Sequence, residues 1–176
     1  MLDRAWFAGA SLWAPAARDC EVTVMIWVLE PDQVVLLPGA ESWEEVVRLL
    51  ARVLLLKGFV RETYVNAVIS REREYPTGLE AGEINVAVPH ADAGHVVRTS
   101  LCVGVLGRPV RFSRMDEPAK STDVTVVFLL AVAEPEQQVE ALRKVMDVIH
   151  DQGVLKEIAD YSSAEQAFGL LSRCLS

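Results

Sequence analysis

The stretch DVTVVFLLAVA, residues 123–133, is long and apolar at nearly every position. A strand with one face in solvent alternates polar and apolar side chains, whereas a strand covered on both faces does not need to alternate. The run therefore predicts a central strand buried on both faces. Sheets of this kind occur in α/β domains, in which helices lie on the two sides of the sheet.

Regular elements are predicted on both sides of this run. β-Branched residues and nearby turn signals predict further strands at Asp32–Leu37, Ile84–Val88 and Ser100–Leu106. Helical spacing of apolar residues predicts helices at 42–58, Arg61–Glu74, 135–151 and 162–174. The order is one strand, two helices, several strands and then two or more helices, which favours a layered α/β domain with a mostly buried sheet.

The ends of the helices have recognisable sequence signals. Ser42 with Glu45, and Ser162 with Glu165, have the spacing of capping boxes. Gly58 is a suitable residue to end the first helix. The helix at 135–151 is expected to bury one apolar stripe, formed by Val139, Leu142, Met146 and Ile149.

Length and charge limit the classes of function. A chain of 176 residues with 51% hydrophobic and 24% charged residues is typical of one globular domain. The net charge of −8 argues against nucleic acid or an anionic membrane as the partner, because both bind clustered Lys and Arg. A small molecule or another protein is the expected partner.

The cysteines and the hydropathy indicate the compartment. Cys20, Cys102 and Cys174 are odd in number and widely spaced, which does not fit a disulfide framework and favours a reducing, cytoplasmic setting. Cys102 is expected to be a small core residue. No apolar run approaches the ~20 residues of a membrane-spanning helix, so direct membrane insertion is not expected.

The first residues differ from the rest. Residues 1–24 are rich in Ala and Trp without helical or strand periodicity, and we expect a poorly structured extension before a domain at 25–176. The alternative, a signal peptide, fits less well, because Asp3 removes the basic start and Pro15 interrupts the apolar stretch.

A possible site of chemistry follows the strand predicted at Ile84–Val88. Pro89 cannot donate to a sheet ladder and marks the strand end, so His90 is expected just beyond it, where α/β proteins commonly bind ligands. A neutral imidazole there can attack a phosphoryl group and form a phosphohistidine. Two alternatives stay open, a structural or solvated histidine and a metal site formed by His90, Asp92 and His95.

A phosphohistidine needs an acceptor for its other ring nitrogen, and cationic or N–H donors around the phosphoryl oxygens. Arg71 lies near the end of a predicted helix, and Thr77 and Gly78 follow it in a turn. His95 could hydrogen-bond the phosphate or hold His90. These residues are the candidate donors.

The combination of motifs resembles a known family. REREYPTGL (71–79), NVAVPHADAGHV (85–96), RPVRF (108–112) and VTVVFLLAVAEPEQQVEALRKVM (124–146) occur in the order found in the enzyme IIA domain of the phosphoenolpyruvate-dependent sugar phosphotransferase system. The sequence is similar to the fructose–mannitol class (type 2), and within it to the galactitol-like branch. The resemblance extends from Leu29 to the C-terminus.

The resemblance implies a single α/β domain with a central mixed β-sheet flanked by helices on both faces. It implies that HPr phosphorylates His90, which passes the phosphoryl group to a IIB component, usually onto a cysteine, for uptake through the IIC transporter. By position in the motifs, Arg71 matches a phosphate-binding side chain, and Thr77 and Gly78 match a turn that lines the site. The reaction needs no metal and no cofactor.

One position departs from the wider family. Many members have a second active-site histidine after the long strand, and here Gln138 stands near that position. The galactitol-like branch often has Gln there and a histidine five residues after Pro-His, so His95 is expected to be the auxiliary histidine. Gln138 remains a candidate donor to the phosphate. Glu72 and Asp92 are expected to oppose excess negative charge near the site.

Two other functions stay open. Domains that resemble this family also act as regulators that bind other proteins according to their phosphorylation state. A metal-dependent hydrolase using His90 and His95 is a third hypothesis.

Overall fold

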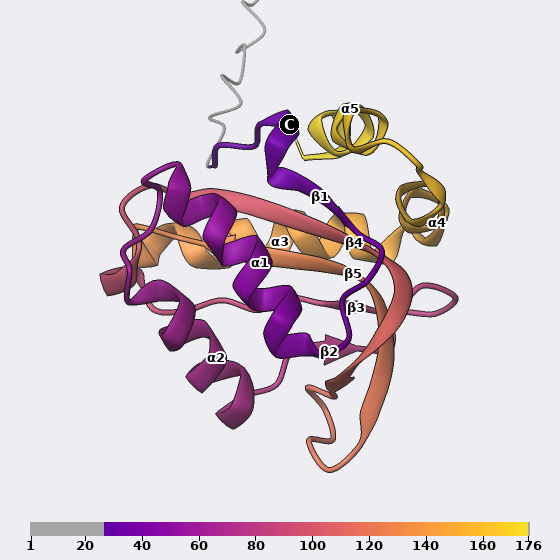
Figure 1. Cartoon of the computed structure of the whole chain (residues 1–176), viewed down its shortest axis with the longest axis horizontal. Coiled ribbons are helices and arrows are strands. Elements are labelled where there is room, and N and C mark those ends of the chain that lie inside the picture. The colour runs from indigo at the N-terminus through magenta and orange to yellow at the C-terminus, as the bar shows by residue number, and fades with distance from the viewer. Residues whose placement is uncertain (1–26, 176) are drawn as a thin grey trace, which may run out of the picture.

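The computed structural model describes residues 27–175, and the extension expected at residues 1–24 lies outside this range (Figure 1). The described chain forms a five-stranded sheet with the order β1-β4-β5-β3-β2. The strands are β1 (Val34–Leu37), β2 (Gly78–Leu79), β3 (Val86–Ala87), β4 (Ser100–Ser113) and β5 (Ser121–Ala131). β4 pairs antiparallel with β5, whereas β1 and β3 pair parallel with β4 and β5, respectively. The sheet is therefore mixed, as predicted.

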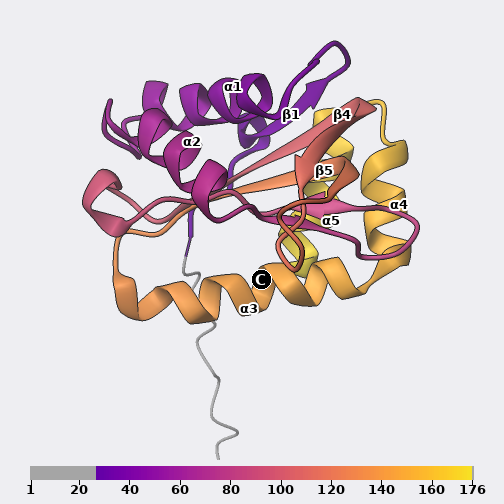
Figure 2. The same cartoon turned by 90° about the horizontal axis from the view of Figure 1, so that it is seen from below.

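Helices cover both faces of the sheet (Figure 2). On one face lie α1 (Trp43–Leu56) and α2 (Tyr64–Glu74), and on the other lie α3 (Gln138–His150), α4 (Gln152–Asp160) and α5 (Ala164–Cys174). Side chains of β5 alternate between two separate apolar clusters, with Leu129 in the first and Phe128 in the second. The prediction of a central strand with both faces buried is confirmed.

The start and end of α1 follow the predicted signals. The Ser42 hydroxyl accepts a hydrogen bond from the Glu45 N–H at 3.3 Å. The Glu45 carboxylate bonds the N–H of Glu41 at 3.0 Å, one residue before the partner that a capping box requires. Gly58 has a φ of 72°, a left-handed conformation that favours glycine after a helix.

The strands differ from the prediction in two places. β4 continues to Ser113, seven residues past its predicted end at Leu106, because a shift in register between Val105 and Val110 lets the strand pass the Gly107–Pro109 segment. β2 was not predicted, because its two residues pair with β3 inside a segment that has the composition of a turn.

The C-terminal helices also differ. The predicted helix at 135–151 ends at His150, and a separate α4 begins after Asp151, whose side chain accepts from the Val154 N–H. The prediction of Ser162 as a capping residue is wrong, since Ser163 occupies the N-cap of α5 and its side chain makes no capping bond. The prediction for Val139 is also wrong: it is 78% exposed, and the buried stripe of α3 passes through Ala141, Val145 and Val148.

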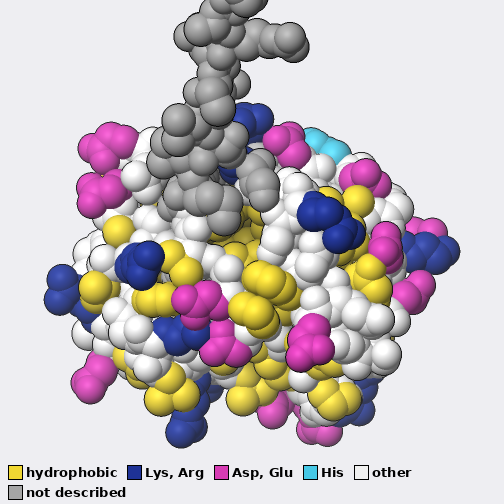
Figure 3. All heavy atoms as spheres, turned by 90° about the horizontal axis from the view of Figure 1, so that it is seen from above, with side chains coloured by type: hydrophobic (Ala, Val, Ile, Leu, Met, Phe, Trp, Pro, Cys, Tyr) yellow, Lys and Arg dark blue, Asp and Glu magenta, His cyan; other side chains and the backbone are white. Residues whose placement is uncertain are grey.

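The surface shows mixed charge on the face of Figure 3. Acidic and basic side chains are interspersed there with apolar ones, and neither sign forms a continuous field. This distribution agrees with the net charge of −8 in giving no basic stripe for a phosphate backbone on that face.

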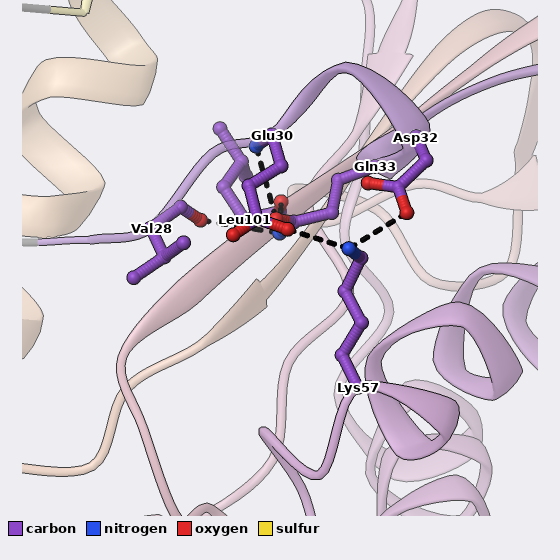
Figure 4. Close-up of polar contacts among 6 residues, drawn as sticks. All are labelled: Val28, Glu30, Asp32, Gln33, Lys57 and Leu101. Carbon is purple, nitrogen blue, oxygen red and sulfur yellow. Dashed lines mark hydrogen bonds and ion pairs between the residues drawn. The ribbon is translucent and has the colours of Figure 1, made fainter.

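The side chain of Gln33 joins the segment before β1 to the sheet through hydrogen bonds (Figure 4). Its side chain is fully buried, and its amide nitrogen donates to the carbonyl oxygens of Val28 at 3.1 Å and Leu101 at 2.6 Å. Its amide oxygen accepts from the Glu30 N–H at 3.0 Å. A buried amide with three partners satisfies backbone groups that would otherwise lose water without compensation.

Replacing Gln33 with Leu keeps the volume and removes these bonds. We expect a loss of about 1–3 kcal/mol in the free energy of unfolding, measured by urea denaturation, because three backbone groups lose their partner. The matched control is Gln166→Leu, at an exposed position of α5, which should change stability by less than about 0.5 kcal/mol. Equal effects of the two substitutions would contradict the role given to Gln33.

Candidate functional site

The site begins where β3 ends. Pro89 follows the strand, and its carbonyl accepts from the Leu130 N–H of β5 at 3.0 Å, while His90 forms an isolated parallel bridge with Leu130. The central strand therefore fixes the backbone of His90. The expected position of His90, just beyond the C-terminal end of a buried strand, is confirmed.

One nitrogen of the His90 imidazole makes a hydrogen bond, and the other has no hydrogen-bond partner within residues 27–175. Nδ1 lies 2.9 Å from the Val88 carbonyl oxygen. A carbonyl only accepts hydrogen bonds, so in the neutral ring the proton must be on Nδ1, and Nε2 keeps its lone pair. This arrangement fits a nucleophile whose reactive atom is Nε2.

The environment also favours the neutral ring. Burial, the largest effect, lowers the pKa of His90, and the positive charge of Arg71 lowers it further. The hydrogen bond to Val88 and the negative charge of Asp92 raise the pKa. The net pKa is below the ordinary value, so the lone pair persists to lower pH than in an exposed histidine.

Arg71 lines a hollow that Ala91, the residue after His90, also lines, whereas His90 itself is not among the lining residues. This hollow, called the Arg71 hollow, has a volume of about 360 Å³, and its lining includes Arg71, Tyr75, Asp92 and His95. One guanidinium nitrogen of Arg71 is 3.6 Å from an Asp92 carboxylate oxygen, and its Cζ is 5.7 Å from the centre of the Tyr75 ring. Its Nε is buried and has no hydrogen-bond partner among residues 27–175. Arg71 thus has donor capacity available for an anion.

The structure brings His95 to the same hollow. His95 ends a short 3₁₀ segment, Ala93–His95, and its backbone carbonyl accepts from the Arg61 N–H at 2.9 Å. Its ring Nδ1 lies 2.8 Å from the Thr63 hydroxyl. Thr63 was not predicted from the sequence, because it is 32 residues away and its N-cap position suggests helix capping, which it does not perform.

Thr77 faces the interior. It is 3% exposed, and its hydroxyl donates to Glu72 Oε2 at 2.8 Å and accepts from the Val88 N–H at 3.2 Å. Thr77 is not among the residues that line the Arg71 hollow. The phosphate contact expected for Thr77 stays a prediction, and its observed contacts are with the protein itself.

Gly78 has a packing role in the structure. A Cβ atom at this position would lie 2.5 Å from the Ser113 carbonyl oxygen, so any other residue would push β2 away from β4. Gly78 does not line the Arg71 hollow, and its expected phosphate contact also stays a prediction.

Glu72 lies on the buried side of α2. Its carboxylate accepts from both the N–H and the hydroxyl of Thr77. Burial raises the pKa of Glu72 to about 7, against the two bonds from Thr77, which lower it. The charge of Glu72 near the site was expected from the sequence, whereas its bonds to Thr77 were not.

Gln138 is the first residue of α3, which begins after β5 ends at the same edge of the sheet as His90. It is half-buried and does not line the Arg71 hollow. Its neighbour Gln137 accepts instead from the Thr99 hydroxyl at 3.3 Å. A bond from Gln138 to phosphate stays a prediction.

Residues 27–175 contain neither a metal centre nor a membrane-spanning helix. No group of three or more His, Cys, Asp or Glu side chains has a geometry that could hold a metal ion. None of the helices combines the length and hydrophobicity needed to cross a membrane. Cys102 is buried in β4, as predicted.

Comparisons with known proteins agree on one family. The model of the phosphoenolpyruvate-dependent sugar phosphotransferase system EIIA 2 family matches residues 28–174. The galactitol-specific EIIA component of Escherichia coli K12 is 28% identical over 114 residues, which cover 65% of this chain and 75% of that protein.

Solved structures share the fold. The crystal structure of the mannitol IIA domain from Escherichia coli matches with a TM-score of 0.69 and 23% identity, covering 82% of this chain and 99% of that one. The mannitol enzyme IIA in its complex with phosphorylated enzyme IIB from Escherichia coli matches with a TM-score of 0.69 and 23% identity, covering 84% of this chain and 99% of that one. The chain therefore belongs to the EIIA 2 family of the phosphoenolpyruvate-dependent sugar phosphotransferase system.

Proposed function

We propose that this protein is a phosphoryl carrier whose His90 takes a phosphoryl group from phospho-HPr and passes it to a cysteine of a IIB component. The transfer serves uptake of a sugar or polyol through a IIC transporter, and the protein works in the cytoplasm. One observation supports this most strongly: the Val88 carbonyl holds the Nδ1 proton of His90 and leaves the Nε2 lone pair free.

The chemistry is a pair of displacements on phosphorus. The Nε2 lone pair forms a new N–P bond while the N–P bond of phospho-HPr breaks, and the electron pair of that bond returns to the HPr imidazole. In the second step a thiolate of IIB attacks the phosphorus, and the electron pair of the N–P bond returns to Nε2. The Val88 carbonyl stabilises the ring while it carries the phosphoryl group, because the Nδ1–H then bears part of a positive charge.

Arg71 and His95 are suited to bind the phosphoryl oxygens. The guanidinium offers charge-assisted hydrogen bonds, and its 3.6 Å ion pair with the 85% exposed Asp92 side chain is loose enough to be exchanged for phosphate. His95 lines the same hollow, with Nδ1 held by Thr63, so Nε2 is the nitrogen free to contact the phosphate.

The names of the sequence relatives support a role in sugar uptake over the regulatory alternative. The relative from Escherichia coli K12 is named as the galactitol-specific EIIA component of a PTS system. The complex of the mannitol enzyme IIA with phosphorylated IIB supports a IIB partner for a domain with this fold. The proposal therefore places HPr before this protein and a IIB component after it.

The three histidines of the chain provide an internal test. With phosphoenolpyruvate, enzyme I, HPr and labelled phosphate, the protein should gain an acid-labile, base-stable label that His90→Ala abolishes. His150→Ala, at the exposed end of α3, is the control and should label normally. His95→Ala should accept the label but transfer it slowly to IIB. Normal labelling of the His90→Ala variant would refute the assignment.

Arg71 and Arg73 form a matched pair for the role of charge. Arg71→Ala should slow phosphoryl acceptance by roughly 10- to 100-fold, the equivalent of one or two charge-assisted bonds. Arg73 lies two residues further along α2, with its Cζ 6.0 Å from the centre of the Trp43 ring and an ion pair to Glu44, so Arg73→Ala should change the rate less than about twofold. The rates of phosphoryl acceptance are measured by rapid-quench labelling. Equal slowing by both variants would show a general effect of positive charge and would contradict the specific role of Arg71.

The lowered pKa of His90 has a measurable consequence. A histidine whose pKa is depressed stays neutral as the pH falls past the ordinary midpoint near ~6.5, so the nucleophile persists there. In an NMR titration of the unphosphorylated protein, the midpoint of His90 should lie below ~6.5. A midpoint above that value would mean that Asp92 and the Val88 bond outweigh burial and Arg71.

A further inference from the structure

A continuous series of hydrogen bonds connects α2 to the ring of His90. The Thr77 N–H and hydroxyl donate to the two carboxylate oxygens of Glu72 at 2.9 and 2.8 Å. The Val88 N–H donates to the Thr77 hydroxyl oxygen at 3.2 Å, and His90 Nδ1 donates to the Val88 carbonyl at 2.9 Å. Glu72, Thr77, Val88 and His90 are therefore joined without a gap.

The direction of each bond is fixed by chemistry. A backbone N–H can only donate, so the Thr77 hydroxyl oxygen must accept from Val88, and when Glu72 is ionised the hydroxyl hydrogen is directed to its carboxylate. A carboxylate can accept both bonds from Thr77 at once. A residue without a hydroxyl at position 77 would leave the Val88 N–H and one oxygen of Glu72 without their partner.

Burial strengthens the hydrogen bonds of this series. Thr77 is 3%, Val88 3% and Glu72 5% exposed, so water does not compete for these bonds. Hydrogen bonds in such surroundings are stronger than in water, and a missing partner is correspondingly costly.

The backbone around His90 depends on this contact because the neighbouring strands are short. β2 and β3 pair only through Gly78 with Ala87 and Leu79 with Val86. The next pair in this register would be Thr77 with Val88, and there a side chain replaces the backbone as the acceptor of the Val88 N–H. The Thr77 hydroxyl thus extends the ladder by one position, up to the residue that bonds His90.

We propose that Thr77, held by Glu72, is a positioning residue that fixes Val88 so that its carbonyl keeps the proton of His90 on Nδ1 and leaves Nε2 free. The effect on the ring stands on the hydrogen bonds alone, and the effect on phosphoryl transfer rests on the function proposed above. Thr77 then acts through Val88 and does not need to touch the phosphate.

The test compares Thr77→Val, which removes the hydroxyl at nearly constant shape, with Thr77→Ser, which retains it. Thr122→Val is the matched control, because Thr122 is a buried threonine near the start of β5, far along that strand from Leu130. Two quantities are measured in each folded variant. The ring tautomer of His90 is read from ¹⁵N chemical shifts of the unphosphorylated protein at about pH 8, where histidine is neutral. The rate of phosphoryl acceptance from phospho-HPr is measured separately.

We expect a single Nδ1–H tautomer in the wild type, Thr77→Ser and Thr122→Val, with rates within about threefold of one another. Thr77→Val should give a mixture that includes the Nε2–H form and a rate at least roughly tenfold lower, the equivalent of one lost hydrogen bond. If Thr77→Val does not fold, Glu72→Gln provides a second comparison, since one of the two oxygens that accept from the Thr77 N–H and hydroxyl is replaced by an NH2 donor.

A folded Thr77→Val or Glu72→Gln protein with the wild-type tautomer would overturn the proposal. The same change in Thr122→Val would also overturn it, because it would show a general effect of destabilisation. A wild-type protein that takes no phosphate would instead refute the proposed function, and the tautomer comparison would still decide the role of Thr77.

Discussion

The hydrogen bond between His90 Nδ1 and the Val88 carbonyl is the interaction on which the site depends. The bond spans Pro89, which lies just after β3 and has no N–H to donate to a sheet ladder. It also requires a rigid neighbour, which β5 provides through Leu130. The sheet therefore determines both the position of the histidine and the ring nitrogen that is left outside the Val88 bond.

The helices on the two faces of the sheet have different roles. On one face, α2 contributes Arg71 to the hollow that Ala91 also lines and Glu72 to the interior, although the two residues are adjacent in sequence. On the other face, α3, α4 and α5 contribute to the second apolar cluster and pack against the side chains of β5 in that cluster. A carrier of this design needs no deep substrate cavity, because its substrates are the phosphorylated side chain of one protein and the acceptor side chain of another.

The sequence predicted the parts of the fold that depend on local patterns. The apolar run at 123–133, the Ser42 cap and the position of His90 after Pro89 are all confirmed. The failures occur where tertiary contacts decide. Val139 fits a helical stripe but faces solvent, because α3 is rotated so that Ala141 and Val145 meet the sheet.

The site was predicted in a similar way. Residue type and position made His90, Arg71 and His95 candidates, and the resemblance to the family supplied their expected roles. The structure brings Arg71 and His95 to one hollow, which Ala91 next to His90 also lines. The partners Thr63 and Val88 could not be predicted, since their contacts depend on the path of the backbone in three dimensions. The Thr77–Glu72 bonds were missed for the same reason, although both residues lie in the quoted motif.

The most direct test of the central claim is NMR of the phosphorylated protein with ¹⁵N-labelled histidine. We expect a coupling between phosphorus and nitrogen at Nε2 of His90, with the proton retained on Nδ1. A coupling at Nδ1 of His90, or at another histidine, would contradict it.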